Sequence, residues 1–408
     1  MEQPTVAIIG AGISGLTCAF YLQKKGISFQ IIEADTQVGG RVKTEHYKGY
    51  LLDRGFQVLL TNYPELKQVI DLKAIHAKPF RSGATIYTDE KILEMDNPFE
   101  NPASIFSMLF SPIGSLTDKV KVYQLIRKVA SFKEEELLRY KGTDTLTFLR
   151  QYGFSEKFID LFFKPFFGGV FLEFDLKTSS RFFQFVFKQF FEGKAVLPAN
   201  GIGDVPKYLA AQLPEETIRL QTKVEKIEGK TIWLQDGTQM TPDHIVVATD
   251  ADFADTLLDT PTSRTYLDTI CSYFSADVSP SPQKQMLSLL ARPNGIVRHW
   301  CVPSDIQPNY APEGKSLISV TTTFSENLEA SIKNELLPLL GEQVHDWTYL
   351  KSYNVRKSLS FFPAGSQEAP FQVNETTWRC GDYLLYPSLN AAMKSGRQVA
   401  EAIADKVH

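Results

Sequence analysis

The sequence predicts an α/β fold, in which a Rossmann-like nucleotide-binding domain carries an inserted α+β domain with a mixed sheet and a helical part. Three observations support this prediction. The chain opens with an apolar β-run, three spaced glycines and an amphipathic helix. A second apolar run, Ile245 to Ala248, predicts a further buried strand beyond the middle of the chain. The length of 408 residues also exceeds what one ordinary core requires.

The N-terminal segment VAIIGAGISGL has the spacing of a dinucleotide-binding turn. The run Thr5 to Ile9 predicts a buried parallel strand, and Gly10, Gly12 and Gly15 follow it as G-x-G-x-x-G. Gly10 permits the turn, Gly12 lets the backbone approach a pyrophosphate, and Gly15 lets the following helix lie close to the sheet. We expect that helix to end at Gly26.

A second strand, Ser28 to Ile32, ends at Glu33, 18 residues after Gly15. An acidic side chain at this position accepts hydrogen bonds from a ribose diol and repels a 2′-phosphate. NADP is therefore disfavoured, and NAD and FAD remain. The alternative, in which the glycines only form a turn, does not account for the strand, helix, second strand and terminal acid in series.

Motifs at both ends of the chain distinguish these two cofactors. ADTQVGGRV places Gly39, Gly40 and Arg41 after the second strand, where a guanidinium can pair with phosphate oxygens. WRCGDYLLYPSLNAAMKSG, near the C-terminus, contains Gly381 and Asp382. Together they resemble the double FAD-binding signature of the flavin amine oxidase, protoporphyrinogen oxidase and phytoene desaturase superfamily, and most of all its phytoene desaturase-like branch. The chain is identified as a member of that superfamily.

The resemblance implies a GR2-type FAD-binding domain. In this superfamily the Gly-Asp acid meets the ribityl chain, and the final helix, beginning near Ser388, directs its N-terminus at the flavin. An Asp-x-Gly segment after the GGR motif lies beside the flavin ring. The residues thereby implied in FAD binding are Gly10, Gly12, Ile13, Ser14, Gly15, Glu33, Ala34, Gly39, Gly40, Arg41, Asp53, Arg54, Gly55, Phe56, Val224, Ala248, Thr249, Gly381, Asp382, Ser388 and Leu389.

No catalytic residue is assigned from the sequence. Gln57 and Tyr386 are the candidates for side chains that line the flavin, while Arg298, His299 and Tyr353 are polar candidates to face the ring that fit a structural role equally well. Covalent members carry a cysteine upstream of the Gly-Asp motif, and this chain has none between Cys301 and Cys380. We therefore expect FAD to be bound without a covalent bond.

The chain is expected to leave and re-enter one FAD-binding domain. The segment NGIGDVP (200–206) is not a second fingerprint, because Pro206 replaces the third glycine; it predicts a turn with Asp204 as the N-cap of a helix over Val205 to Leu213. A separate NAD(P)H site is thus not expected, and electrons would leave to oxygen, a quinone or another carrier. The predicted domains are residues 1–75, 196–260 and 362–408 for FAD binding, and 76–195 with 261–361 for substrate, mainly helical over 100–195.

Phenylalanine is concentrated in one stretch, since residues 158–191 hold 13 of the 29 phenylalanines. The phenylalanines between Phe182 and Phe191 do not lie on a single face of a helix. Such a helix must pack against other groups on several sides, or it would expose an apolar patch. The alternatives are an ordinary core, the wall of a channel for an apolar substrate, a membrane interface and a second subunit. The resemblance to phytoene desaturases favours the channel.

We therefore predict an FAD-dependent dehydrogenase, desaturase or oxidase. It would transfer hydride from a large hydrophobic substrate, such as a carotenoid or tetrapyrrole, to flavin N5. One alternative is a flavin amine oxidase, although Ser388 and Asn390 occupy the place where amine oxidases have an aromatic ring. The other is a redox-silent FAD-dependent isomerase or carrier of an apolar ligand.

Composition excludes other classes of protein. The net charge of −4 does not favour nucleic acid as a partner. The four cysteines are far apart, and neither they nor the six histidines form a metal-binding pattern, so no metal is expected. No run of about 18 apolar residues is present. These features predict a cytoplasmic protein, with peripheral contact to a membrane as a further alternative; they do not predict an oligomeric state.

Overall fold

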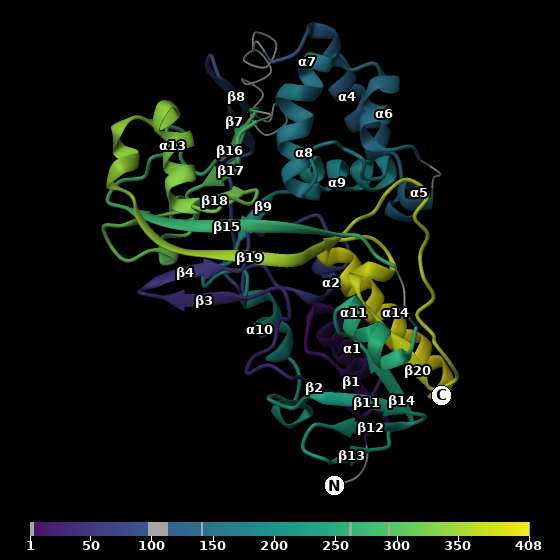
Figure 1. Ribbon diagram of the computed structural model, residues 1–408. Coiled ribbons are helices and arrows are strands. Elements are labelled where there is room, and N and C mark those ends of the chain that lie inside the picture. Colours follow the sequence, from purple (N-terminus) through teal and green to yellow (C-terminus); the bar gives the residue numbers. More distant parts are fainter. Residues whose placement is uncertain (1–3, 97–112, 140–141, 261–262, 293, 408) are drawn as a thin grey trace.

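The computed structural model describes residues 4–96, 113–139, 142–260, 263–292 and 294–407 (Figure 1). Residues 100–112 of the predicted helical part lie outside these ranges. Figure 1 shows a parallel sheet near both termini, long strands across the middle and a group of helices at the opposite end. Among the described residues, no helix is both long and apolar enough to cross a membrane.

A five-stranded parallel sheet is assembled from three distant parts of the chain. Its order is β10 (Ile218–Arg219), β2 (Phe29–Ile32), β1 (Val6–Ile9), β14 (His244–Val247) and β20 (Thr377–Arg379). All four pairings are parallel. β1 lies at the centre and is buried along its whole length, as expected of an all-apolar strand covered on both faces.

Both faces of this sheet are covered. α1 (Ile13–Lys24) and α14 (Leu389–Val407) pack together so closely that a Cβ on Gly396 would lie 2.3 Å from the carbonyl oxygen of Ser14. On the other face lie α11 (Ala251–Leu258) and a three-stranded antiparallel sheet. Its strands are β11 (Val224–Glu228), β12 (Thr231–Leu234) and β13 (Gln239–Met240).

A seven-stranded mixed sheet forms the second layer of the molecule. In order, its strands are β19 (Thr348–Ser360), β15 (Tyr266–Ala276), β18 (Ser316–Thr322), β17 (Val297–Cys301), β16 (Leu287–Leu290), β7 (Gly83–Tyr87) and β8 (Ile92–Asp96). Only β16 and β7 pair in parallel among these strands. α13 (Leu328–Leu340) covers one face through Ile332 and Leu336, which pack in one cluster with Trp300.

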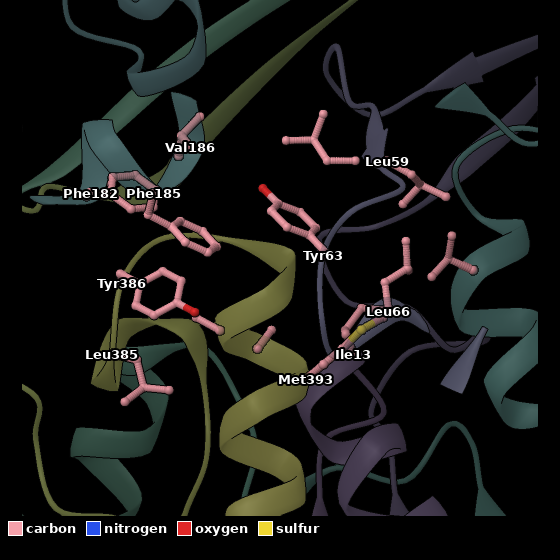
Figure 2. Packing of buried hydrophobic residues seen from close by; sticks show 14 of the residues in the cluster. Ile13, Leu59, Tyr63, Leu66, Phe182, Phe185, Val186, Leu385, Tyr386 and Met393 are labelled. Carbon is pink, nitrogen blue, oxygen red and sulfur yellow. The ribbon is translucent and has the colours of Figure 1, made fainter. Parts of the chain in front are cut away.

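The helical part contains most of the phenylalanine-rich stretch. It comprises α4 (Leu116–Ala130), α5 (Glu134–Arg139), α6 (Thr145–Tyr152), α7 (Glu156–Phe158), a π-helical turn (Ile159–Phe163), α8 (Lys164–Phe171) and α9 (Ser180–Glu192). Its core joins the core around α1 and α14 in one apolar cluster. Figure 2 shows this junction, where Tyr63 stacks on Phe185 with ring centroids 6.0 Å apart.

Short elements connect these layers. They are β3 (Thr44–Tyr47), β4 (Tyr50–Asp53), β5 (Leu59–Leu60), α2 (Leu66–Val69), β6 (Lys78–Pro79), β9 (Ala195–Leu197), α10 (Asp204–Ala210), α12 (Pro303–Ile306) and 3₁₀ turns at 215–217, 308–310, 342–346 and 382–384. The predicted cap of α10 was wrong. Gly203 is the N-cap, and the helix spans Asp204–Ala210 instead of Val205 to Leu213. The Asp204 carboxylate does not cap the helix; it accepts hydrogen bonds from the backbone and side-chain nitrogens of Asn200, each at 3.1 Å.

Candidate active site

One cavity of about 750 Å³ extends from the parallel sheet to the helical part. At one end it is lined by the glycine turns after β1 and β2. At the other it is lined by side chains of β7, β17, β18, α8 and α9. The two ends differ in chemistry, since the first is rich in glycine and charge, whereas the second is rich in phenylalanine and includes the cations Arg81 and Lys119.

The glycine turns form an open cradle at the first end. Gly12, the N-cap of α1, has φ −73° and ψ 177°, and a Cβ added there would meet no atom within 4 Å. Gly12 forms an isolated parallel bridge with Gly39, and Gly40 approaches it so closely that a Cβ there would lie 3.4 Å from the Gly12 Cα. The first turn of α1 contains no acidic residue, so its free N–H groups favour an anion.

Glu33 closes one side of this cradle. Its carboxylate accepts a hydrogen bond from the backbone nitrogen of Ala11 at 2.7 Å and another from Asp35 at 2.8 Å. These bonds hold the ends of β1 and β2 together while the side chain still lines the cavity. The remaining lone pairs of a carboxylate in this position suit a ribose diol.

Arg41 and Asp382 bring the two ends of the chain together. They form an ion pair in which the Asp382 side chain is 7% exposed, and this proximity raises the pKa of Arg41. Arg41 also donates to the carbonyl oxygen of Ser358 at 2.9 Å. Nearby, Ser388 accepts a hydrogen bond from the backbone nitrogen of Ala391 at 3.0 Å and so caps the start of α14.

Most residues predicted for FAD binding line this cavity. They are Gly10, Gly12, Ile13, Ser14, Glu33, Ala34, Gly39, Gly40, Arg41, Arg54, Gly55, Phe56, Val224, Ala248, Thr249, Gly381, Asp382, Ser388 and Leu389, together with the substrate candidate Gln57. Gln57 donates from Nε2 to the carbonyl oxygens of Arg41 at 3.2 Å and Arg54 at 3.1 Å. An open glycine cradle, a helix N-terminus, an acid and an arginine fit a flavin dinucleotide.

Gly15 and Asp53 lie outside the cavity lining. A Cβ on Gly15 would stand 2.1 Å from the carbonyl oxygen of Gly10. The absence of a side chain at Gly15 therefore lets α1 pack closely against the end of β1. Asp53 is 4% exposed and accepts hydrogen bonds from Thr44 Oγ1 at 2.5 Å, Ile202 N at 3.0 Å and Tyr310 OH at 2.8 Å. Asp53 therefore supports the segment that follows it, which does line the cavity.

Tyr386 also lies outside the cavity lining. Its ring packs 5.2 Å from that of Phe185 in the core (Figure 2). Its hydroxyl donates to Glu134. Of the three polar candidates, His299 lines the cavity, whereas the hydroxyl of Tyr353 donates to Glu45 at 2.8 Å and Arg298 lies over the ring of Phe174.

Sequence reasoning did not include several residues that line the cavity. At the dinucleotide end these include Thr222, Lys223 and Asp250, of which Asp250 directly follows the predicted contact Thr249. At the other end Thr321 lies on β18, between its antiparallel partners β15 and β17. No local pattern marks such a residue.

Aromatic rings form the second end of the cavity. The phenylalanines that line it in the helical part are Phe158, Phe162, Phe166, Phe167, Phe182, Phe190 and Phe191. Phe166 and Phe190 meet edge to face at 5.0 Å. In contrast, Phe163 and Phe183 are fully buried and belong to the core behind this wall. We call the part of the cavity lined by these seven rings the phenylalanine chamber.

The fold and the cavity fit a flavin-dependent oxidoreductase, because the glycine cradle and the phenylalanine chamber belong to one cavity. A model of the flavin-containing amine oxidoreductase family matches residues 13–404, and the chain belongs to this family. FAD is its cofactor.

Two curated relatives match parts of the chain. Protoporphyrinogen oxidase 2 of Arabidopsis thaliana is 24% identical over 167 residues, which cover 40% of this chain and 32% of that protein. The lycopene-forming phytoene desaturase of a Paracoccus species is 31% identical over 138 residues, which cover 34% of this chain and 24% of that protein. The chain thus matches no more than about a third of the length of either relative.

Solved structures resemble the whole chain. Cyclohexylamine oxidase from Brevibacterium oxydans IH-35A covers 100% of both chains with a TM-score of 0.72 and 15% identity. Putrescine oxidase bound to putrescine covers 99% of both, with a TM-score of 0.74 and 16% identity. Reduced UDP-galactopyranose mutase has a TM-score of 0.70 and 15% identity, and the match covers 99% of this chain and 96% of that chain. These likenesses establish the fold.

Proposed function

We propose that the chain is a dehydrogenase, desaturase or oxidase that removes hydrogen from a large apolar substrate, such as a carotenoid or a tetrapyrrole. The observation that carries this proposal is the continuity of one cavity, from the glycine cradle and Arg41 to the phenylalanine chamber. A substrate in that chamber lies in the same space as the cofactor. Bound FAD supplies the two-electron oxidation.

The charges along the cavity favour an apolar substrate over an amine. Among the described residues, the carboxylates that line it are Glu33, Asp250 and Asp382, all near the dinucleotide end. Glu33 and Asp382 already have partners. A protonated amine in the phenylalanine chamber would lose its hydration without gaining a carboxylate, which is costly. Amine oxidation therefore remains the second candidate, supported by the fold shared with cyclohexylamine and putrescine oxidases.

The chain's own contribution is to bind, to align and to exclude water. The partly buried rings of Phe166, Phe190 and Phe191 offer an apolar area to a flat or extended molecule. Alignment of a substrate C–H against the cofactor supplies much of the rate without a strong acid or base. The relatives named protoporphyrinogen oxidase and phytoene desaturase support this class of substrate.

The electron acceptor is proposed to be oxygen, a quinone or another carrier. The described cysteines Cys18, Cys271, Cys301 and Cys380 are all buried, and none lines the cavity, which supports FAD bound without a covalent bond. Denaturation and filtration of the yellow protein should release all of its FAD. Oxygen uptake and quinone reduction during turnover would then identify the acceptor.

Anaerobic titration of the FAD-loaded protein tests the proposed function. Phytoene and protoporphyrinogen IX represent the apolar class, while cyclohexylamine and putrescine represent the amines. We expect one of the apolar probes to bleach the visible flavin absorbance, and the amines to leave it unchanged. Bleaching by an amine alone would contradict the proposal. Conversion of an apolar probe without bleaching, and only after chemical prereduction, would instead establish the redox-silent isomerase.

A further inference from the structure

Two buried polar side chains lie side by side in the wall of the cavity. His299 on β17 and Thr321 on β18 are paired directly across the two strands. Each residue is 4% exposed, and each lines the cavity. Because directly paired residues project from the same face of a sheet, the two side chains are neighbours on the face that meets the cavity.

Both side chains carry a polar atom without a partner. His299 Nε2 and Thr321 Oγ1 are buried, and neither forms a hydrogen bond within the described part of the chain. Most buried polar atoms in folded proteins are hydrogen-bonded, since leaving one unsatisfied is costly. Two such atoms on neighbouring residues, both in a cavity wall, indicate that a bound molecule supplies the missing partner.

The sheet is irregular at this position. β17 has one extra residue, Arg298, between the pair Val297–Thr322 and the pair His299–Thr321. A bulge of this kind changes the direction of the next side chain and is common beside active sites. The bulge thus immediately precedes the residue whose imidazole enters the cavity wall.

Packing fixes the imidazole of His299 in place. Its ring centroid lies 4.9 Å from that of Phe56, within the segment that follows Asp53 and lines the cavity. On another side, a Cβ added to Gly169 would stand 2.9 Å from His299 Nδ1. Phe56 and the bare backbone of Gly169 therefore hold the imidazole against two different parts of the cavity wall.

The charge state of this pair limits what it can bind. Burial lowers the pKa of His299 to about 4, so its imidazole is neutral near pH 7 and offers one donor and one acceptor. The threonine hydroxyl can also donate and accept. A carboxylate or ammonium group would need an opposite charge in this buried wall, whereas a neutral oxygen needs only hydrogen bonds.

We propose that His299 and Thr321 form a substrate-binding subsite that hydrogen-bonds a hydroxyl or carbonyl oxygen on an otherwise apolar substrate. This inference rests on the proposed function and narrows its substrate class from large apolar molecules in general to those that carry a hydroxyl or carbonyl oxygen. The subsite binds and orients the substrate, and neither residue is assigned a proton-transfer step.

Equilibrium binding of two matched volatile probes to the FAD-loaded protein tests the subsite. The probes are 2-decanone and decane, which differ in one carbonyl, and headspace gas chromatography measures the free concentration of each. The variants are His299→Phe and Thr321→Val, with His299→Gln as the conservative change. Ser288→Ala is the matched control, because Ser288 is a buried hydroxyl of the neighbouring strand β16 that does not line the cavity.

We expect the wild-type protein to prefer 2-decanone over decane. The ratio of the two binding constants should fall about fivefold in His299→Phe and in Thr321→Val, because each variant removes one hydrogen bond to the carbonyl oxygen. His299→Gln should restore part of it, and Ser288→Ala should leave it unchanged. Circular dichroism melting curves confirm that each variant is folded.

The possible failures are distinguishable. If both probes bind but no variant changes their ratio, the subsite is refuted while the proposed function stands. If His299→Phe instead weakens FAD binding or shifts the flavin spectrum at an unchanged ratio, the pair serves the cofactor and the subsite is again refuted. If neither probe binds the FAD-loaded wild-type protein, the proposed apolar-substrate function itself fails.

Discussion

Arg41 and Asp382, 341 positions apart in the sequence, form an ion pair in the lining of the cavity. The same guanidinium donates to the carbonyl oxygen of Ser358 on β19. One side chain therefore joins the turn after β2, the segment after β20 and the second sheet. The glycine-rich end of the cavity forms where these three segments meet.

Replacing Asp382 should weaken FAD binding more than it weakens the fold. In Asp382→Asn we expect the dissociation constant for FAD to rise about tenfold, because Arg41 loses the charge that orients it. The unfolding free energy should change by about 1 kcal/mol or less, since the Arg41 side chain is 45% exposed. Fluorescence titration of FAD measures the first quantity. The control Glu156→Gln breaks the exposed Arg150–Glu156 pair and should leave FAD binding intact.

Two glycines of the first turn should respond in opposite ways to substitution by valine. Gly12→Val should fold normally but lose FAD, because Gly12 has an ordinary φ and its Cβ meets only open space in the cavity. Gly15→Val should destabilise the protein whether or not FAD is present, since its Cβ would clash with the backbone of Gly10. Melting temperatures of the FAD-free proteins, together with flavin content, separate the two effects. Equal destabilisation by both variants would refute the cradle.

Two phenylalanines of α9 distinguish the chamber wall from the core. Phe183→Ala should cost about 3–5 kcal/mol of stability, because Phe183 is fully buried among the rings of Phe163, Phe167 and Phe187. Phe190→Ala should cost much less, because the ring is only partly buried, yet it should raise the KM for the apolar substrate. Urea unfolding and steady-state kinetics measure the two properties. An unchanged KM in Phe190→Ala would contradict the placement of substrate in the phenylalanine chamber.

His299 should make the fold sensitive to acid. Burial lowers its pKa from 6.5 to about 4, so the unfolded chain binds the proton more readily than the folded one. The contribution of His299 to the free energy of unfolding is therefore greatest above pH 6.5, and it falls by about 3 kcal/mol as the pH drops to about 4. Asp53 has the opposite slope, because burial raises the pKa of its carboxyl to about 6.

The difference in unfolding free energy between wild type and His299→Phe isolates the histidine, since Asp53 is common to both proteins. Denaturant titrations at fixed FAD concentration between pH 4 and pH 7 measure this difference. We expect the variant to gain about 3 kcal/mol relative to wild type at the acidic end. A difference that does not vary with pH would show that the imidazole is hydrated in the folded protein.

The glycine-rich end of the cavity could be predicted because its determinants are local. Gly10 has a φ of 107°, which glycine adopts readily, and Glu33 follows β2 directly. The positions of these residues in the sequence are therefore enough to predict the turn and the acid beside it. Asp382 and Ser388 were expected at the FAD site only because of the resemblance to a known superfamily, and both line the same cavity from the far end of the chain.

Other features depend on contacts between residues that are far apart in the sequence, and the spacing of motifs does not reveal them. Tyr386 lies two residues before Ser388, but its direction is set by a hydrogen bond to Glu134, 252 positions away. The pairing of His299 with Thr321 depends on the bulge at Arg298 and the register of three strands. The phenylalanine-rich stretch was ambiguous for a related reason, since α9 contributes to both the core and the cavity wall.

We propose that FAD and an apolar substrate share one cavity, with the cofactor at the glycine end. Electron density from crystals of the FAD-loaded protein would locate the cofactor. We predict dinucleotide density along Gly12, Glu33 and Gly40, with the space between Phe166 and Phe190 left free for substrate. Flavin density that fills the phenylalanine chamber, or a dinucleotide bound away from Gly12, would contradict the account.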